Sequence, residues 1–347
     1  MTSSIAVIGA GIVGLSCALH LAEAGYFVTL YEGDKANDNA SKAAMGVVSV
    51  KGVAFAHSQR YKNILSEFWR LKAEASVASC QTGVYEFFAT SADLNTVLKR
   101  IAYRRFRGLY NIELLKKEAL PNLVHGSVLK EAGALYYPED FFFKPWELLD
   151  AKMAKIEKNG CQKVAENVDF IGQTQSSQLL VKTRSGQREF DDVLICAGAG
   201  SLDLLSRFCE SPPQFKLQKA QSGRILHVNT KASFALKKGK ESFQLNHGDI
   251  CFGPLKEDFN EKLLCSYFQQ KWGLSLDLAG SQFLQRSATR VVSSKRVPFI
   301  GTLQLKNSQK RVLVATAFDK NGYLLGDLAA RRILTILMQT QSYLSTR

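Results

Sequence analysis

The sequence lacks the long hydrophobic runs, internal repeats and low-complexity segments that mark several large classes of protein. No stretch approaches the ~20 apolar residues that a helix needs to cross a bilayer. The first apolar run begins almost at Met1 and is typical of a strand, so we expect no signal peptide. With 46% hydrophobic and 22% charged residues, the chain is predicted to be globular, and at 347 residues two domains are expected.

Clustered metal ligands are also lacking. The seven cysteines form no CxxC pair, and the five histidines are dispersed along the chain, so we expect neither a zinc nor an iron site. An odd, scattered set of cysteines fits a reducing compartment. The sequence therefore predicts a cytoplasmic protein, and peripheral association with the inner face of a membrane is left open.

Acidic residues are few, because 31 Asp and Glu face 45 Lys and Arg and leave a formal net charge of +14. Such a charge attracts an anionic cofactor and carboxylate substrates. It would attract a nucleic acid or an anionic membrane surface in the same way. Residues 91–107 read as a helix with a basic end, which fits a solvated face or a contact with phosphates. Charge alone does not separate these partners.

The first 32 residues contain the most informative pattern in the chain. An apolar run at 5–8 enters Gly9-x-Gly11-x-x-Gly14, residues 12–24 have helical apolar spacing, and a second strand at 27–31 ends at Glu32. The interval from the third glycine to the acid is close to the ~20 residues expected of a dinucleotide-binding βαβ unit. The pattern predicts a site for NAD or FAD.

Each part of this unit has a physical reason. Gly9 allows a tight turn, Gly11 lets the backbone approach a pyrophosphate, and Gly14 lets helix and strand pack closely. The helix N-terminus offers N–H groups and the positive end of its dipole to the phosphates. Glu32 can accept hydrogen bonds from ribose hydroxyls.

Three further segments carry a resemblance to a known family. They are the run of small residues Ala40-Ser41-Lys42-Ala43-Ala44-Met45-Gly46, the strand that ends in Ala197-Gly198, and the C-terminal Arg290-x(7)-Pro298-x-Ile300-Gly301 followed by Asn321-Gly322. Together with the glycine motif they resemble the FAD-dependent D-amino-acid oxidase superfamily, nearest to its glycine oxidase and D-amino-acid dehydrogenase group.

The resemblance implies an α/β fold with two domains. A discontinuous Rossmann-like FAD-binding domain is expected at 1–80, 145–215 and 290–347. An interleaved substrate domain with a mainly antiparallel β-sheet is expected at 81–144 and 216–289. Within it, residues 223–228, 242–245, 250–254 and 263–268 read as strands, and 231–240 as a hairpin or surface loop.

The resemblance also implies a non-covalently bound FAD. The residues expected to contact it are Gly9, Ala10, Gly11, Ile12, Val13, Gly14, Glu32, Gly33, Ala40, Ser41, Lys42, Met45, Gly46, Val168, Ala197, Gly198, Asn321, Gly322, Tyr323 and Leu324. The turn and helix that begin at Asn321 are expected to direct N–H groups at the flavin ring, where the helix dipole favours negative charge.

For the substrate, the resemblance implies that Arg290 grips a carboxylate bidentately; an ordinary salt bridge is the competing interpretation. Other candidates for the catalytic pocket are Tyr137, His247 and Tyr267, each weighed against a structural role. The expected reaction is oxidation of the C–N bond of a small amino acid or secondary amine by hydride transfer to flavin N5, and water then hydrolyses the imine.

Two departures leave alternatives open. Ala317-Phe318 stands where the family usually has Gly-His, and Lys295 stands where an acid usually follows Arg290. One alternative is the FAD oxidase domain of the bifunctional enzyme that modifies the wobble uridine of tRNA, which the net charge favours. The other is a flavoprotein that modifies or assists a partner protein. Oxygen or a quinone as electron acceptor and the oligomeric state also stay open.

Overall fold

The computed structural model describes residues 3–33, 39–49, 58–88, 95, 98–99, 102, 112–115, 133–230, 232–238, 241–254, 261–272 and 274–345. By its internal contacts the chain separates into two compact units. Unit 1 comprises Met1–Ala43, Trp146–Ala220 and Ser287–Arg347, and unit 2 comprises Ala44–Pro145 and Gln221–Arg286. Residues 44–80 thus group with unit 2, whereas the sequence placed them in the cofactor domain. No helix in the described ranges is long and apolar enough to span a membrane.

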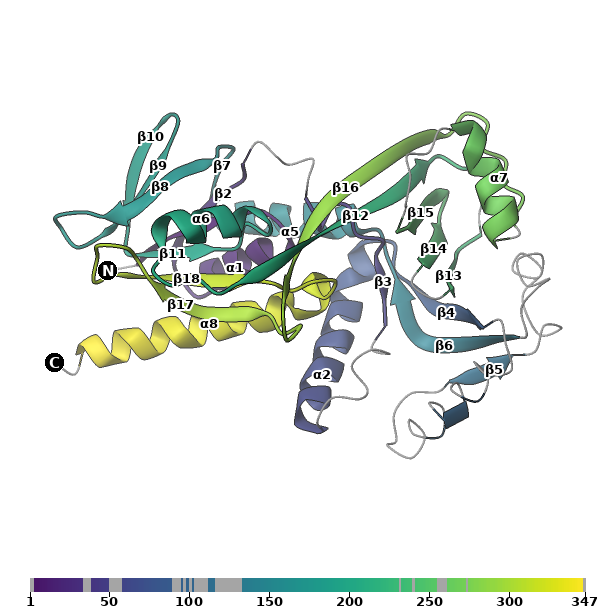
Figure 1. Ribbon diagram of the computed structural model, residues 1–347, viewed down its shortest axis with the longest axis horizontal. Coiled ribbons are helices and arrows are strands. Elements are labelled where there is room, and N and C mark those ends of the chain that lie inside the picture. Colours follow the sequence, from purple (N-terminus) through teal and green to yellow (C-terminus); the bar gives the residue numbers. More distant parts are fainter. Residues whose placement is uncertain are drawn as a thin grey trace. The chain divides into compact units, whose positions relative to one another are not determined.

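Unit 1 is built on a six-stranded sheet in the order β17-β18-β11-β1-β2-β7 (Figure 1). Its strands are β1 (Ser4–Ile8), β2 (Phe27–Tyr31), β7 (Gln162–Val164), β11 (Asp192–Ile195), β17 (Phe299–Gln304) and β18 (Arg311–Thr316). All pairs are parallel except β17 with β18. Because β1 lies between β2 and β11, the carboxyl ends of these three strands meet at one edge of the sheet.

Both faces of this sheet are covered within unit 1. The covering elements are the helices α1 (Ile12–Glu23), α5 (Pro145–Lys158), α6 (Gly200–Phe208) and α8 (Gly322–Ser345), and a meander of β8 (Val168–Gln173), β9 (Leu179–Thr183) and β10 (Gly186–Phe190). Ala6 and Ile8 of β1 share a buried cluster with residues of the meander and α6. The buried side chains of Ile5 and Val7 point to the opposite face, because strand side chains alternate.

Unit 2 contains most of a nine-stranded sheet in the order β16-β12-β15-β14-β13-β4-β6-β3, with β5 beside β6. The strands are β3 (Val47–Val48), β4 (Gln81–Phe88), β5 (Glu113–Leu115), β6 (Gly133–Phe142), β12 (Phe215–Leu226), β13 (Phe234–Lys238), β14 (Glu241–Asn246), β15 (Asp249–Gly253) and β16 (Gln282–Ser293). The helical elements are α2 (Ser58–Glu74), the 3₁₀ turn η2 (Ala75–Val77) and α7 (Glu261–Trp272). The sheet is mainly antiparallel, with β4 and β13 parallel.

The predicted fold class is confirmed, since a parallel α/β sheet and a mainly antiparallel sheet share the chain. One local prediction is wrong: residues 263–268 lie in helix α7 rather than in a strand. Leu264, Phe268 and Trp272 recur every fourth residue and are all buried, so the helical period is clear only over the longer segment. Most of the predicted basic helix at 91–107 lies outside the described residues.

The middle of the segment at 231–240 is a strand of the sheet rather than a surface loop. Its residues 234–238 form β13, which pairs antiparallel with β14 and parallel with β4. Leu236 is fully buried there. Residues 234–238 thus form one strand of a β-hairpin with β14, and two of the lysines that suggested a loop, Lys237 and Lys238, lie in this strand.

Candidate functional site

The glycine turn lies between β1 and α1 and is shaped by close backbone contacts. Gly9 has a φ of +113°, and a Cβ there would lie 2.6 Å from the carbonyl oxygen of Cys196. A Cβ on Gly14 would lie only 1.8 Å from the carbonyl oxygen of Gly9. Neither position admits a side chain, so the two glycines allow β1, α1 and the end of β11 to come together.

Helix α1 begins with a glycine and receives its cap from another segment. Gly11 is the N-cap and has no side chain to satisfy the first N–H groups of the helix. Ser41 supplies the missing group, because its Oγ accepts a hydrogen bond of 3.0 Å from the Ile12 N–H. The first turn of α1 contains no acidic residue, so an anion at this helix end would meet no negative side chain there.

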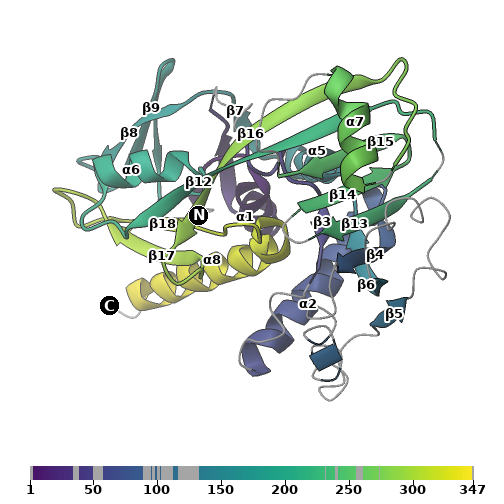
Figure 2. The same cartoon turned by 45° about the vertical axis from the view of Figure 1, so that its right-hand side comes forward.

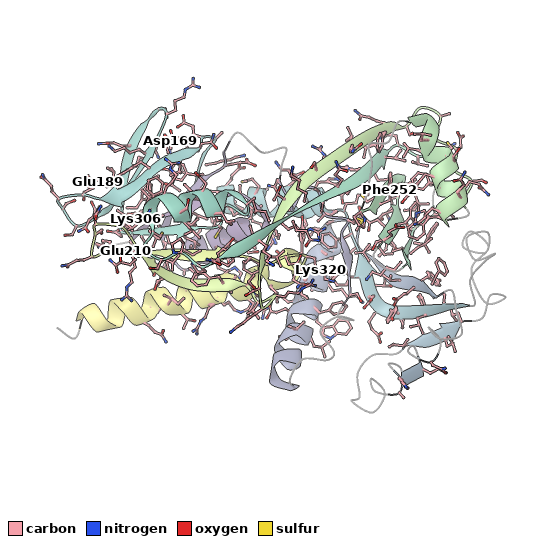
Figure 3. All side chains as sticks on the ribbon, viewed as in Figure 1. Asp169, Glu189, Glu210, Phe252, Lys306 and Lys320 are labelled. Carbon is pink, nitrogen blue, oxygen red and sulfur yellow. The ribbon has the colours of Figure 1, made fainter. Side chains whose placement is uncertain are left out.

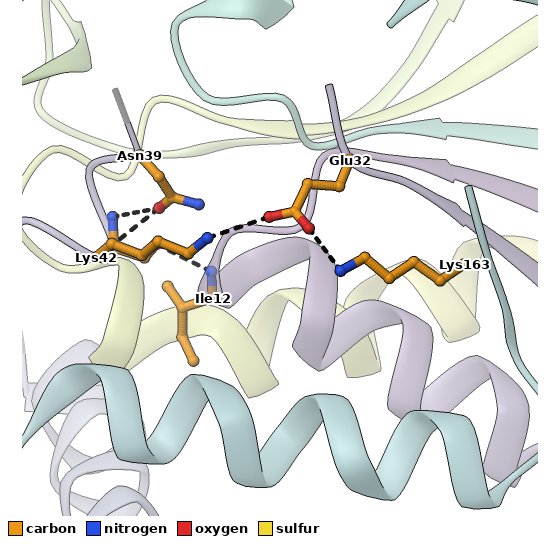
Figure 4. A network of polar contacts seen from close by, with 6 residues as sticks. Ile12, Glu32, Asn39, Lys42 and Lys163 are labelled. Atoms are coloured by element: carbon orange, nitrogen blue, oxygen red, sulfur yellow. Dashed lines mark hydrogen bonds and ion pairs between the residues drawn. The ribbon is translucent and has the colours of Figure 1, made fainter. Parts of the chain in front are cut away.

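Ser41 also joins α1 to the start of α8. The Tyr323 hydroxyl, on the first turn of α8, donates a 2.9 Å hydrogen bond to the Ser41 carbonyl oxygen. The Ser41 N–H in turn donates to Asn39 Oδ1 at 2.8 Å, and the Lys42 N–H donates to the same oxygen at 3.2 Å (Figure 4). This turn therefore links two helix N-termini that lie at opposite ends of the sequence.

Glu32 stands at the end of β2 and is flanked by two lysines (Figure 4). Its carboxylate lies 2.8 Å from Lys163 Nζ and 3.3 Å from Lys42 Nζ. Burial alone would raise the pKa of this carboxyl, but the hydrogen bonds and charges of Lys163 and Lys42 outweigh it and hold the pKa below its ordinary value. Glu32 is therefore ionised at neutral pH and keeps acceptor capacity, since a carboxylate offers about four lone-pair sites.

Helices α1 and α8 approach each other closely at their N-terminal ends, and they lie side by side in Figures 1 and 2. A Cβ on Gly322 would lie 3.3 Å from Ile12 Cγ2, and one on Gly326 would lie 3.1 Å from Ser16 Oγ. The residue after Gly326, Asp327, pairs with the buried Lys152 of α5 at 3.3 Å. Burial opposes ionisation of Asp327, but Lys152 and Ser16 lower its pKa. Small residues thus let α1 and α8 approach closely, and the ion pair joins α8 to α5.

The predicted cofactor residues are divided between the two units. Ala197 and Gly198 follow β11, where a Cβ on Gly9 would come within 2.7 Å of Ala197 Cα. Those that lie in unit 1 are Gly9, Ala10, Gly11, Ile12, Val13, Gly14, Glu32, Gly33, Ala40, Ser41, Lys42, Val168, Ala197, Gly198, Asn321, Gly322, Tyr323 and Leu324, whereas Met45 and Gly46 lie in unit 2. Gly46 has a φ of +70° and its carbonyl oxygen accepts the Phe143 N–H at 3.1 Å.

The predicted substrate residues have separate surroundings. Arg290 lies in unit 1, where its Nη1 is 4.0 Å from Asp319 Oδ1. In unit 2, the buried Tyr137 donates a 2.8 Å hydrogen bond to Glu86, and His247 Nε2 lies 3.0 Å from Gln81 Nε2. Tyr267 lies on α7, and its ring packs on Phe252 and Phe268, with centroids 5.7 Å and 5.5 Å away.

Two charged residues at the site have no signal in the sequence. Lys163 reaches Glu32 because β7 pairs with β2, and no motif announces that pairing. Asp319 meets Arg290 because the loop before α8 bonds to β16, through an isolated bridge between Val292 and Phe318. Among the described residues, no group of three or more His, Cys, Asp or Glu side chains could hold a metal ion.

The family model described as DAO, FAD dependent oxidoreductase, matches residues 4–335. No curated protein sequence matches the chain.

Solved structures show the same fold at low identity. An iminodiacetate oxidase from Chelativorans sp. BNC1 superposes with a TM-score of 0.77 and 18% identity, over 96% of this chain and 95% of its own. Glycine oxidase from Geobacillus kaustophilus gives 0.76 and 16%, over 97% and 95%. Glycine oxidase from Bacillus cereus ATCC 14579 gives 0.75 and 18%, over 98% and 96%.

Proposed function

Because this chain belongs to the DAO family of FAD-dependent oxidoreductases, we propose that it oxidises the C–N bond of a small amino acid or secondary amine. Membership in this family establishes that the protein is an oxidoreductase and that its cofactor is FAD. The proposal that the substrate is a small amino acid or secondary amine is supported by the activities of proteins with similar structures, which include iminodiacetate oxidase and glycine oxidase.

The residues of unit 1 fit FAD, and the observation that carries the proposal is the double role of Ser41. Its side chain caps α1 at Ile12 while its carbonyl oxygen holds Tyr323 at the start of α8. One short turn thereby brings together a helix end suited to a pyrophosphate and a second helix end. We infer that the glycine turn holds the pyrophosphate, that Glu32 accepts from the ribose hydroxyls, and that Val168 and Ala197-Gly198 border the nucleotide.

In this proposal unit 1 is the FAD-binding domain and unit 2 supplies the substrate domain. Bound FAD supplies the hydride acceptor for oxidation of the C–N bond, and water hydrolyses the resulting imine. The chain itself binds and orients the substrate and excludes water from the site. No protein base is required at the reacting carbon. The first turn of α8 would direct its N–H groups and the positive end of its dipole at the flavin ring, which gains negative charge on reduction. Arg290 is the candidate contact for the substrate.

Two observations test this proposal. The purified protein is expected to be yellow, with an absorption band at about 450 nm that dithionite bleaches. Anaerobic addition of a panel of D-amino acids, N-methyl amino acids, small L-amino acids and simple secondary amines should bleach the same band with at least one member. A protein that binds FAD and is reduced by none of them would remove amine oxidation.

The net charge of +14 favours a second candidate, a flavoenzyme that acts on a modified uridine of tRNA. Binding through phosphates would weaken steeply as salt rises, because each contact releases counterions. Filter retention of tRNA at low salt, lost on raising the salt, supports this candidate, and no retention at low salt rejects it. The third interpretation, a flavoprotein that assists a partner protein in the cytoplasm, predicts bound FAD that no small amine reduces.

A further inference from the structure

The loop that precedes α8 has an unusual backbone for its composition. Ala317 and Asp319 have φ values of +64° and +52°, so two non-glycine residues out of three consecutive ones lie in the left-handed region. Aspartate tolerates this region, but alanine does not favour it, at a cost of about 1 kcal/mol. Such strained positions persist where the surrounding structure over-determines them, and they cluster at functional sites.

Three backbone contacts hold the loop in this shape. Phe318 forms an isolated antiparallel bridge with Val292, next to β16's Val291, whose carbonyl oxygen accepts the Asp319 N–H at 3.2 Å. The Asn321 N–H then donates to the Phe318 carbonyl oxygen at 2.9 Å, and α8 begins one residue later. The position of the Asp319 side chain is therefore fixed by main-chain bonds to the strand that carries Arg290.

The result is a partly buried ion pair. Arg290 Nη1 lies 4.0 Å from Asp319 Oδ1, and the two side chains are 31% and 13% exposed. The negative charge also sits just before the N-terminus of α8, where the helix dipole favours it. Lys320, labelled in Figure 3 at the same turn, forms no ion pair within the described ranges and remains a second cation beside this pair.

We propose that Asp319 determines the substrate class by compensating the charge of Arg290, an inference that rests on the proposed function. The enzyme then prefers secondary amines without a carboxylate on the reacting carbon. A substrate carboxylate that approached Arg290 would have to share the guanidinium with Asp319 or displace it. Two carboxylates at one guanidinium repel each other, and juxtaposed like charges are costly in a partly buried site. An uncharged alkyl group at the same place meets no such penalty.

The binding arm of the test requires no turnover. Acetate is titrated into the FAD-loaded protein, and binding is followed by the visible flavin spectrum and by calorimetry. Asp319→Asn keeps a residue that tolerates positive φ and should bind acetate about tenfold more tightly than the wild type. Asp203→Asn is the matched control, because it removes the acid of an exposed pair with Arg207 in the same unit. Equal acetate affinity in Asp319→Asn and wild type overturns the proposal, as does tight acetate binding by wild type that Lys320→Gln abolishes.

The kinetic arm compares N-methylglycine with N-methylethylamine, which differ by a carboxylate in place of a methyl group. Wild type should have the higher kcat/KM for N-methylethylamine, and Asp319→Asn should shift the ratio about tenfold toward N-methylglycine, mainly through KM. A wild type that prefers N-methylglycine contradicts the proposal. If neither amine nor any of the panel reduces the flavin, the proposed function fails, while the acetate titration still decides the role of Asp319.

Discussion

The two units stabilise their polar residues in different ways. Around Ser41 in unit 1, a glycine turn, a helix N-terminus and main-chain carbonyls make most of the contacts. In unit 2, pairs of side chains make such contacts: Lys144 pairs with Asp249 at 2.8 Å, and the Tyr137 hydroxyl donates to the Glu86 carboxylate at 2.8 Å. A site fixed by the backbone tolerates few substitutions at its glycines, whereas a site fixed by side chains can be changed one group at a time.

The largest effect is expected at Gly14. A methyl group placed 1.8 Å from the Gly9 carbonyl oxygen forces strand and helix apart, because neither backbone can yield cheaply. Gly14→Ala should lose about 3 kcal/mol of unfolding free energy and should be purified without FAD. Gly186→Ala is the control, since no atom lies within 4 Å of its added Cβ. Urea unfolding and the 450-to-280 nm absorbance ratio, with the flavin band at about 450 nm, measure both effects; a yellow, stable Gly14→Ala protein would break the contrast.

In unit 2, the comparable loss is expected from a side chain. Lys144→Met leaves the Asp249 carboxylate, which is only 14% exposed, without its cation and should lower the unfolding free energy by about 3 kcal/mol. Replacing both partners, in Lys144→Met with Asp249→Leu, should restore a good part of it, because no charge then stays buried. FAD binding measured by fluorescence should remain in both variants at temperatures where they are folded. If the double variant is no more stable than Lys144→Met, the unpaired charge of Asp249 is not the cause of the lost unfolding free energy.

Glu32 should show how a single charged side chain acts at the backbone-defined site. Glu32→Gln is expected to weaken FAD binding about tenfold, since it loses the ion pairs with Lys42 and Lys163 that orient the group. The folded-state pKa of Glu32 lies below its ordinary value of 4.5. Its ionised form therefore stabilises the fold above that pH, by about 1 kcal/mol.

This contribution has a predictable dependence on pH. The difference in unfolding free energy between wild type and Glu32→Gln should be fully present at pH 7 and should shrink as the pH falls below 4.5 through the lowered pKa of the folded protein. Chemical unfolding of both proteins without FAD, in a pH series, gives that difference directly. A difference that grows on acidification would reverse the assigned sign.

The smallest effects separate two tyrosines whose hydroxyls each donate a hydrogen bond to another segment. Tyr323→Phe loses the bond to the Ser41 carbonyl oxygen, and Tyr137→Phe loses the bond to Glu86. Each should cost about 1 kcal/mol of stability, but only Tyr323→Phe should also weaken FAD binding. If Tyr137→Phe lowers kcat with FAD fully bound, Tyr137 belongs to the catalytic pocket, as the sequence predicts.

The sequence carried the parts of unit 1 that depend on local order. The segment from Ile5 to Glu32 predicted β1, α1 and β2, because a short apolar run, helical apolar spacing and glycine spacing are all short-range signals. Residues 263–268 were misassigned, because six residues are too few to distinguish a buried helix from a strand. The boundary of unit 2 near residue 44 had no signal in composition.

Contacts between distant segments could not be predicted from one sequence. The cap that Ser41 provides to Ile12, the pairing of Lys163 with Glu32, and the pairing of Asp319 with Arg290 each depend on three-dimensional packing. The resemblance to a family indicated which motifs belong together, but not which charges compensate one another. These compensating charges are therefore a feature of the structure that the motifs alone do not predict.

The contact between α1 and α8 has a consequence for how the protein is made. Strand β1, the glycine turn and α1 are synthesised before the helix that packs on α1 and holds Ser41. Until α8 has been made, the apolar face of α1 therefore lacks its native neighbour, and such long-range closure is slow. The contact between α1 and α8 cannot form before α8 has been made, so a chain that terminates before Gly322 would contain the whole glycine motif without the helix that packs beside it.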